Sequence, residues 1–133
     1  MTKSASFTLA ALASLSVVVP AQVWAKPMSN SDFAIINQCS NAARLVVMSA
    51  ERNPSSHDER SSFSNGLFEE LKKQGKFGKD APTEIDVLIA QSAVESLISQ
   101  GGSPVGAQGH DWFLSQASAT CALQRRFLNI ESK

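Results

Sequence analysis

The sequence predicts an all-α protein, a small four-helix bundle in which one disulfide joins the first and last helices. Apolar residues recur at three- and four-residue steps in four segments, which is the period of an α-helix. Capping residues and glycine or proline stops bound these segments, whereas no segment shows the sustained alternation of a strand. The predicted helices lie near residues 31–52, 57–74, 84–100 and 104–128.

The first helix is predicted from residue 31, where Asn30 or Ser31 can cap it and Asp32 complements the positive end of the helix dipole. Pro54 ends it, because the residue before a proline disfavours the helical conformation. One face of this helix carries the apolar residues Ile36, Cys39, Ala43, Val46 and Ala50.

The second helix begins at Ser56, which forms a capping-box pattern with Glu59 three residues later. Gly75 is a typical stop at its end. Its predicted apolar stripe contains Phe63, Leu67 and Leu71, with Phe68 beside it.

The third helix is predicted to begin after Thr83, a capping residue, and to end at Gly101-Gly102. Its predicted stripe consists of Ile85, Leu88, Ile89, Ser92, Ala93 and Leu97. Pro104 suits the first position of the fourth helix. The predicted face of that helix contains Leu114, Ala117, Cys121 and Leu128.

Residues 1–25 read as a cleaved secretory signal peptide, which leaves residues 26–133 as a single helical domain. Lys3 precedes an uncharged and mostly apolar run over residues 7–19, and small residues lead up to Ala25. The run is shorter than the roughly 20 residues that a membrane-spanning helix needs. We therefore expect cleavage near Ala25-Lys26, a periplasmic or fully secreted protein, and no membrane insertion after cleavage.

The charge balance argues against a nucleic-acid partner. The chain has 12 basic and 12 acidic residues, and loss of Lys3 with the signal leaves a net charge of −1. Proteins that bind nucleic acids usually present a strongly basic face. The sequence does not define the oligomeric state.

Both cysteines, Cys39 and Cys121, follow the predicted cleavage point, and both lie on predicted inward faces of helices. In an exported protein an even number of cysteines indicates disulfide pairing. With two cysteines the alternatives are one intramolecular bond, a free thiol pair or a bridge between chains. The sequence favours the intramolecular bond, which would clamp the two ends of the bundle together.

No catalytic, cofactor-binding or metal-binding motif is present, so no residue is assigned to any of these roles. Nucleophile elbows, phosphate-binding loops, dinucleotide fingerprints and haem-attachment sequences are all missing. The acids Glu84, Asp86 and Glu95 are available for a carboxylate-dependent hydrolase, but a solvated helix face is their expected position. Each histidine precedes an aspartate, at His57-Asp58 and His110-Asp111, and these acids are expected to stabilise helix N-termini.

Two aromatic residues are candidates for contact with a partner. Phe77 lies between Lys76 and Lys79 on a glycine-flanked turn, where it can either anchor a partner or fold back over the helix ends. Trp112, near the start of the last helix, can either line a groove or pack in the core.

A non-enzymatic protein-interaction module is the function that the sequence favours, because it offers a small scaffold without catalytic chemistry. The alternatives are a small carboxylate-dependent hydrolase and a carrier of a small apolar ligand, which would need an internal cavity. The helix count and the single disulfide resemble several groups of small exported proteins: toxin-immunity proteins, acid-stress chaperones and secretion pilotins. This resemblance is one of fold only, and it implies an inhibitor, immunity, chaperone or secretion-assembly role.

Overall fold

Four packed α-helices make up residues 29–131, the part of the chain that the computed structural model describes, with side chains to residue 128. The helices are α3 (Asn30–Arg52), α4 (His57–Lys73), α5 (Glu84–Ser99) and α6 (Ala107–Glu131), and a short 3₁₀ turn, η1 (Gly78–Asp80), lies between α4 and α5. The described residues contain no strand. This architecture confirms the predicted fold class; the predicted signal peptide lies outside the described residues.

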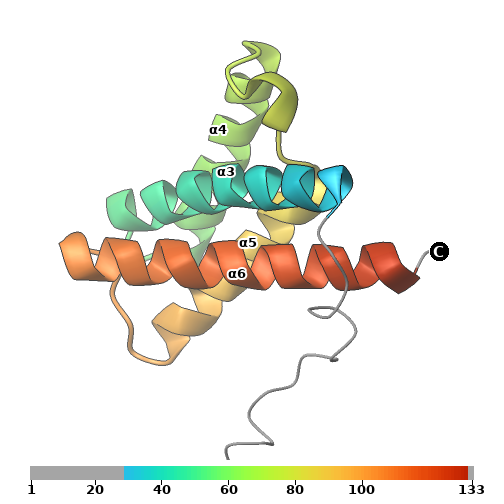
Figure 1. Ribbon diagram of the computed structural model, residues 1–133. Helices are drawn as coiled ribbons and strands as arrows, with labels where there is room; N and C mark the ends of the chain where they lie inside the picture. The colour runs from blue at the N-terminus through green and yellow to red at the C-terminus, as the bar shows by residue number, and fades with distance from the viewer. Residues whose placement is uncertain (1–28, 132–133) are drawn as a thin grey trace, which may run out of the picture.

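The helices α3 and α6 lie side by side and run in opposite directions, while α4 and α5 cross this pair at a steep angle (Figure 1). The arrangement brings the beginning of α3 beside the end of α6, where Cys39 and Cys121 form the predicted disulfide. Among the described residues, no helix combines the length and the apolar character that crossing a membrane requires.

Local capping defines where α3 and α5 begin. Ser29, rather than Asn30 or Ser31 as predicted, caps α3: its hydroxyl accepts a hydrogen bond from the Asp32 amide, and its own amide donates to the Asp32 carboxylate. Thr83 and Asp86 form the same reciprocal arrangement at the start of α5, which confirms the predicted cap. Each box satisfies amides that the first helical turn would otherwise leave unpaired.

The start of α6 differs from the prediction. The helix begins at Ala107 rather than at Pro104, because Gly106 has a φ of +91°, which is outside the helical range. Gly109 lies so close to the backbone of Ser103 that the Cβ atom of any other residue would collide with it.

The main core forms where α3, α5 and α6 approach one another through small side chains. Five alanines of this core have no exposed surface, and small residues allow helices to pack closely. Larger side chains from every helix fill the space around them. The fully buried alanines are Ala42, Ala43, Ala50, Ala90 and Ala117, and the larger core residues include Leu45, Val46, Val47, Phe68, Val87, Val94 and Phe113.

Several predicted core positions are wrong. Ile36 is 40% exposed, because the buried face of α3 passes through Ile35 instead. In α5 the buried apolar residues are Val87, Ala90 and Val94, so the predicted stripe lies nearer to the solvent than this row. Its members Ile85 and Leu88 are 54% and 64% exposed, and Leu128 of α6 is also exposed.

Candidate functional site

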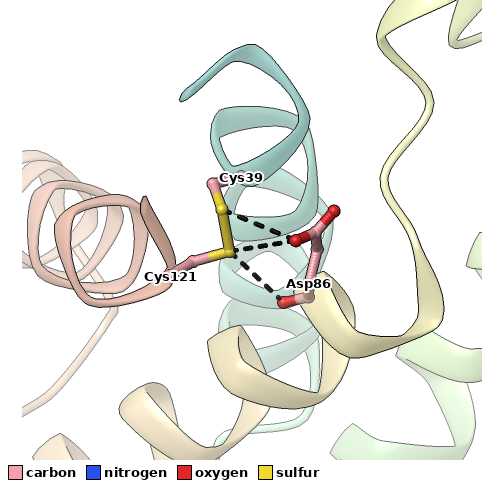
Figure 2. Close-up of side chains that lie close together, drawn as sticks. All are labelled: Cys39, Asp86 and Cys121. Carbon is pink, nitrogen blue, oxygen red and sulfur yellow. Dashed lines mark hydrogen bonds between the residues drawn. A yellow bond between two sulfur atoms is a disulfide. The ribbon is translucent and has the colours of Figure 1, made fainter. Parts of the chain in front are cut away.

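The described residues include three places where side chains from different helices form a distinct site: the disulfide, a polar pocket between α4 and α5, and a groove between α5 and α6. The first centres on Asp86, a residue without exposed surface. Its Oδ1 atom lies 3.7 Å from the Cys39 sulfur and 3.6 Å from the Cys121 sulfur (Figure 2). The Asp86 backbone carbonyl also lies 3.8 Å from the Cys121 sulfur.

Arg125 completes this centre. Its guanidinium donates to Asp86 Oδ1 and also to the Thr83 hydroxyl, at 3.3 Å. Arg125 follows Cys121 by one helical turn, so both side chains point to the same face of α6. The charge of the buried carboxylate is therefore paired, and its second oxygen accepts the Thr83 amide at 2.8 Å.

The cysteines and Asp86 place three metal-ligand atoms within 4.8 Å of one another. Thiolates, rather than disulfide sulfurs, are the form of cysteine that binds metals, and both sulfurs here are joined to each other. In the oxidised protein this centre is thus a structural junction of α3, α5 and α6.

The second place is a pocket of about 200 Å³ between α4 and α5. Arg60 binds Glu95 through two hydrogen bonds of 2.6 and 2.8 Å, and its remaining nitrogen donates to the backbone carbonyls of Asn53 and Pro54. The hydrogen bonds from Arg60 lower the pKa of Glu95, against the opposing effect of burial, and His57 adds to the lowering. Opposite Arg60, Gln91 donates to Ser64 and to Asn65.

These contacts assign the α4–α5 pocket a structural role. Arg60 ties the α3–α4 turn to α5, and both Glu95 and Gln91 are already engaged. A general acid needs a raised pKa, whereas Glu95 is held ionised.

The acids and histidines have positions that the sequence did not predict. Asp86 and Glu95 are paired with arginines from other helices rather than lying on a solvated face, and only Glu84 is exposed. His57 lies 3.2 Å from Glu95, and His110 lies 3.1 Å from Glu51 of α3.

The acids that follow the histidines differ from each other. Asp58 lies in the first turn of α4 as predicted, but Asp111 lies beyond the first turn of α6 and so does not serve its N-terminus.

The turn at Phe77 folds back onto the protein. Phe77 is half-buried against the core, with its ring centroid 6.4 Å from that of Phe68, while Lys76 and Lys79 are exposed. The Asn41 side-chain amide fixes the turn by donating a hydrogen bond to the Asp80 backbone carbonyl at 2.9 Å. Of the two alternatives for Phe77, the structure thus shows the one in which it covers the helix ends.

The third place is a groove of about 570 Å³ between α5 and α6, and no charged residue lines it. Both apolar and uncharged polar side chains line the α5 side, and uncharged polar side chains line the α6 side. We call this surface the α5–α6 groove; its lining residues are Leu88, Ile89, Ser92, Ala93, Ser96, Leu97, Gln100, Gln116, Thr120 and Gln124.

Exposed apolar residues continue the groove beyond its lining. Ile85, one turn before Leu88 and Ile89, extends the α5 side. Phe127 follows Thr120 by seven residues and therefore lies on the same face of α6. Trp112, which is 55% exposed, precedes Gln116 by one turn, so the core-packing alternative for Trp112 is wrong.

This groove is not predicted by the sequence, although its signal is present there. The α5 residues Ile85, Leu88, Ile89, Ala93 and Leu97 belong to the predicted apolar stripe, and such a stripe is expected to face the core of a helical bundle. The fully buried row Val87, Ala90 and Val94 shows that α5 has two apolar faces, and only one of them fits the interior.

Comparisons of this chain with protein-family models, with curated proteins and with solved structures find no match. The three places described above are therefore interpreted from their own geometry and chemistry.

Proposed function

We propose that this protein is an exported, non-enzymatic protein-binding module, and that the α5–α6 groove is its binding surface. The carrying observation is the exposure of Leu88, at 64%, at a groove that is lined by apolar and uncharged polar side chains. Exposed apolar side chains among polar groups are typical of surfaces that bind another protein. The neighbouring exposed residue Trp112 belongs to the type that contributes most to binding energy at such surfaces.

The proposed export rests on the N-terminal sequence together with the disulfide. Disulfides persist in oxidising compartments such as the periplasm, and the apolar run before Ala25 is typical of a secretory signal. Intact-mass measurement of the protein recovered from the periplasmic fraction tests this proposal. The expected mass is that of residues 26–133 less two hydrogens; a mass that retains residues 1–25, or two free thiols, contradicts it.

Affinity capture from the exported fraction, with matched variants, tests the binding surface. Leu88→Lys puts a charge on the lining of the groove at an exposed position, so we expect it to abolish capture of the partner without unfolding the protein. Met48→Lys places the same charge on the outer side of α3, where Met48 is 41% exposed, and serves as the control. Equal capture by both variants would show that the groove is not the binding surface.

A further inference from the structure

We propose that the reduced protein binds one Zn²⁺ ion at the disulfide centre, with Cys39, Cys121 and Asp86 as its protein ligands. The inference goes beyond the binding function above and concerns the form of the chain in which both cysteines are thiols. In the oxidised form the same three side chains already lie together, with their sulfur and carboxylate atoms within 4.8 Å of one another (Figure 2). Zinc accepts both thiolates and carboxylates as ligands in proteins.

The distances between these atoms fit a tetrahedral zinc ion. Zinc holds a thiolate at about 2.3 Å and a carboxylate oxygen at about 2.0 Å, which places the two ligand atoms about 3.5 Å apart. Asp86 Oδ1 lies 3.7 Å from the Cys39 sulfur and 3.6 Å from the Cys121 sulfur. The carboxylate is therefore close to the separation that a shared zinc ion requires. Reduction releases the two sulfurs from each other, and their Cα atoms, 5.5 Å apart, keep both within reach of one ion.

The charges at this centre balance when zinc is bound. The three ligand side chains have no exposed surface, and buried charges are tolerated only where they are compensated. Two thiolates and one carboxylate carry three negative charges, so Zn²⁺ leaves a net charge of −1. The guanidinium of Arg125, which binds Asp86, cancels this charge. Zinc displaces one proton from each thiol, and both protons pass to the solvent.

Hydrogen bonds hold the Asp86 carboxylate in the orientation that the site needs. Its Oδ2 atom accepts the Thr83 amide at 2.8 Å, whereas Oδ1 faces the sulfurs and receives Arg125. Ligand carboxylates in metal sites are commonly held by hydrogen bonds of this kind. Three protein ligands leave the fourth position of the ion to a water molecule. Zinc would thus join α3, α5 and α6 in the reduced protein, where the covalent link between α3 and α6 is absent.

Metal titration of the reduced protein tests the site. A phosphine in urea reduces the disulfide: the phosphine takes the oxygen of a water molecule and becomes its oxide, while the two hydrogens convert the sulfurs to thiols. The protein is then refolded without oxygen and without the phosphine. Co²⁺ reports thiolate ligands through its absorption, and competition with a chelator gives the Zn²⁺ affinity. We expect one ion per chain; no uptake of either metal, or one ion shared by two chains, would overturn the proposal.

Matched variants identify the ligands. The Cys39→Ser/Cys121→Ser double variant should bind no Zn²⁺, and Asp86→Asn should bind it about tenfold more weakly. Asp32→Asn is the control and should not change the affinity. Asp32 occupies the same capping position in α3 and also faces an arginine of α6, Arg126, but it lies two helical turns before Cys39. Uptake by the double variant, or equal affinities of Asp86→Asn and the wild type, would overturn the assigned site.

Zinc should also stabilise the reduced fold, because an ion that binds the folded chain favours it increasingly as the ion concentration rises. We expect the urea midpoint of the reduced protein to rise with the Zn²⁺ concentration, and a reduced chain that is unfolded without metal to fold when zinc is added. The oxidised protein, whose sulfurs are joined to each other, should show no change. A reduced protein whose unfolding does not respond to zinc would overturn the proposal.

Discussion

Asp86 joins three helices through one side chain. It caps α5 through Thr83, receives the Arg125 guanidinium of α6, and lies against the sulfur that α3 contributes to the disulfide. A buried carboxylate is tolerated only when it is paired and hydrogen-bonded, and here both oxygens are engaged. The stability of the junction should therefore depend strongly on this residue.

We expect Asp86→Ala to lower the free energy of unfolding by about 3–5 kcal/mol, because it removes the cap and leaves the Arg125 charge without its buried partner. Asp86→Asn should cost less, since an amide oxygen can still accept the Thr83 amide. Urea denaturation of the two variants measures the difference. Equal and small losses for both would contradict the central role of the carboxylate.

The ion pair of Glu95 predicts a pH dependence. Because the Arg60 hydrogen bonds hold the pKa of Glu95 below its ordinary value of 4.5, its stabilising contribution is complete above pH 4.5 and is lost as the pH falls through the folded-state pKa. We expect Glu95→Gln to be less stable than the wild type by about 1 kcal/mol at pH 7, a modest value for a partly exposed pair. This difference should shrink toward pH 3.

Denaturation curves at several pH values measure this effect, with Glu69→Gln as the control. Glu69 is an exposed glutamate of α4 that forms no ion pair with residues 29–128, so its substitution should give no comparable trend. A difference between wild type and Glu95→Gln that stays constant down to pH 3 would argue against the ionised pair.

At the level of the helices, two glycines should respond to the same substitution in opposite ways. Gly66 lies within α4 and has open space where a Cβ would be, so Gly66→Ala should stabilise the protein by about 0.5–1 kcal/mol. At Gly109 in α6 the same Cβ would collide with the Ser103 carbonyl, which is backbone and cannot move aside cheaply. We expect Gly109→Ala to lower the melting temperature. Thermal unfolding of both variants checks the sign of each effect.

Helix positions were largely predictable because their signals are local. The residues that mark the ends of α4 and α5 lie within one turn of each helix end: Ser56, Thr83 and the glycines that follow the two helices. The structure confirms these helix boundaries. The start of α6 was predicted wrongly because Pro104 is compatible with a helix start, whereas the positive φ of Gly106 is not visible in the residue type alone.

The buried face of α5 and the polar pairs were not predictable from local pattern. Apolar residues occur on two sides of α5, and periodicity alone does not say which side meets α3 and α6. Asp86 and Arg125 are 39 residues apart, so their pairing depends on how the helices cross. The disulfide was predictable despite its long range, because two cysteines in a chain that is predicted to be exported leave few alternatives.

At the scale of the whole molecule, the disulfide should contribute a large share of the stability. It closes a loop with a sequence separation of 82, and restriction of the unfolded chain by such a loop is worth about 4–5 kcal/mol. We expect the Cys39→Ser/Cys121→Ser double variant to lose roughly this amount in urea denaturation. The reduced wild-type protein should show a similar loss; a loss below about 1 kcal/mol in both would contradict the expectation.

The position of this bridge also determines how the molecule responds to mechanical force. Because Cys39 and Cys121 join α3 to α6, the first and last of the described helices, a pull applied outside the bridge passes through the covalent bond rather than through the polypeptide between the two cysteines. The core residues of α4 and α5 then carry no tension, and the domain extends only by the short segments outside the bridge. A chain that must be threaded through a narrow channel in extended form therefore has to pass before this bond closes.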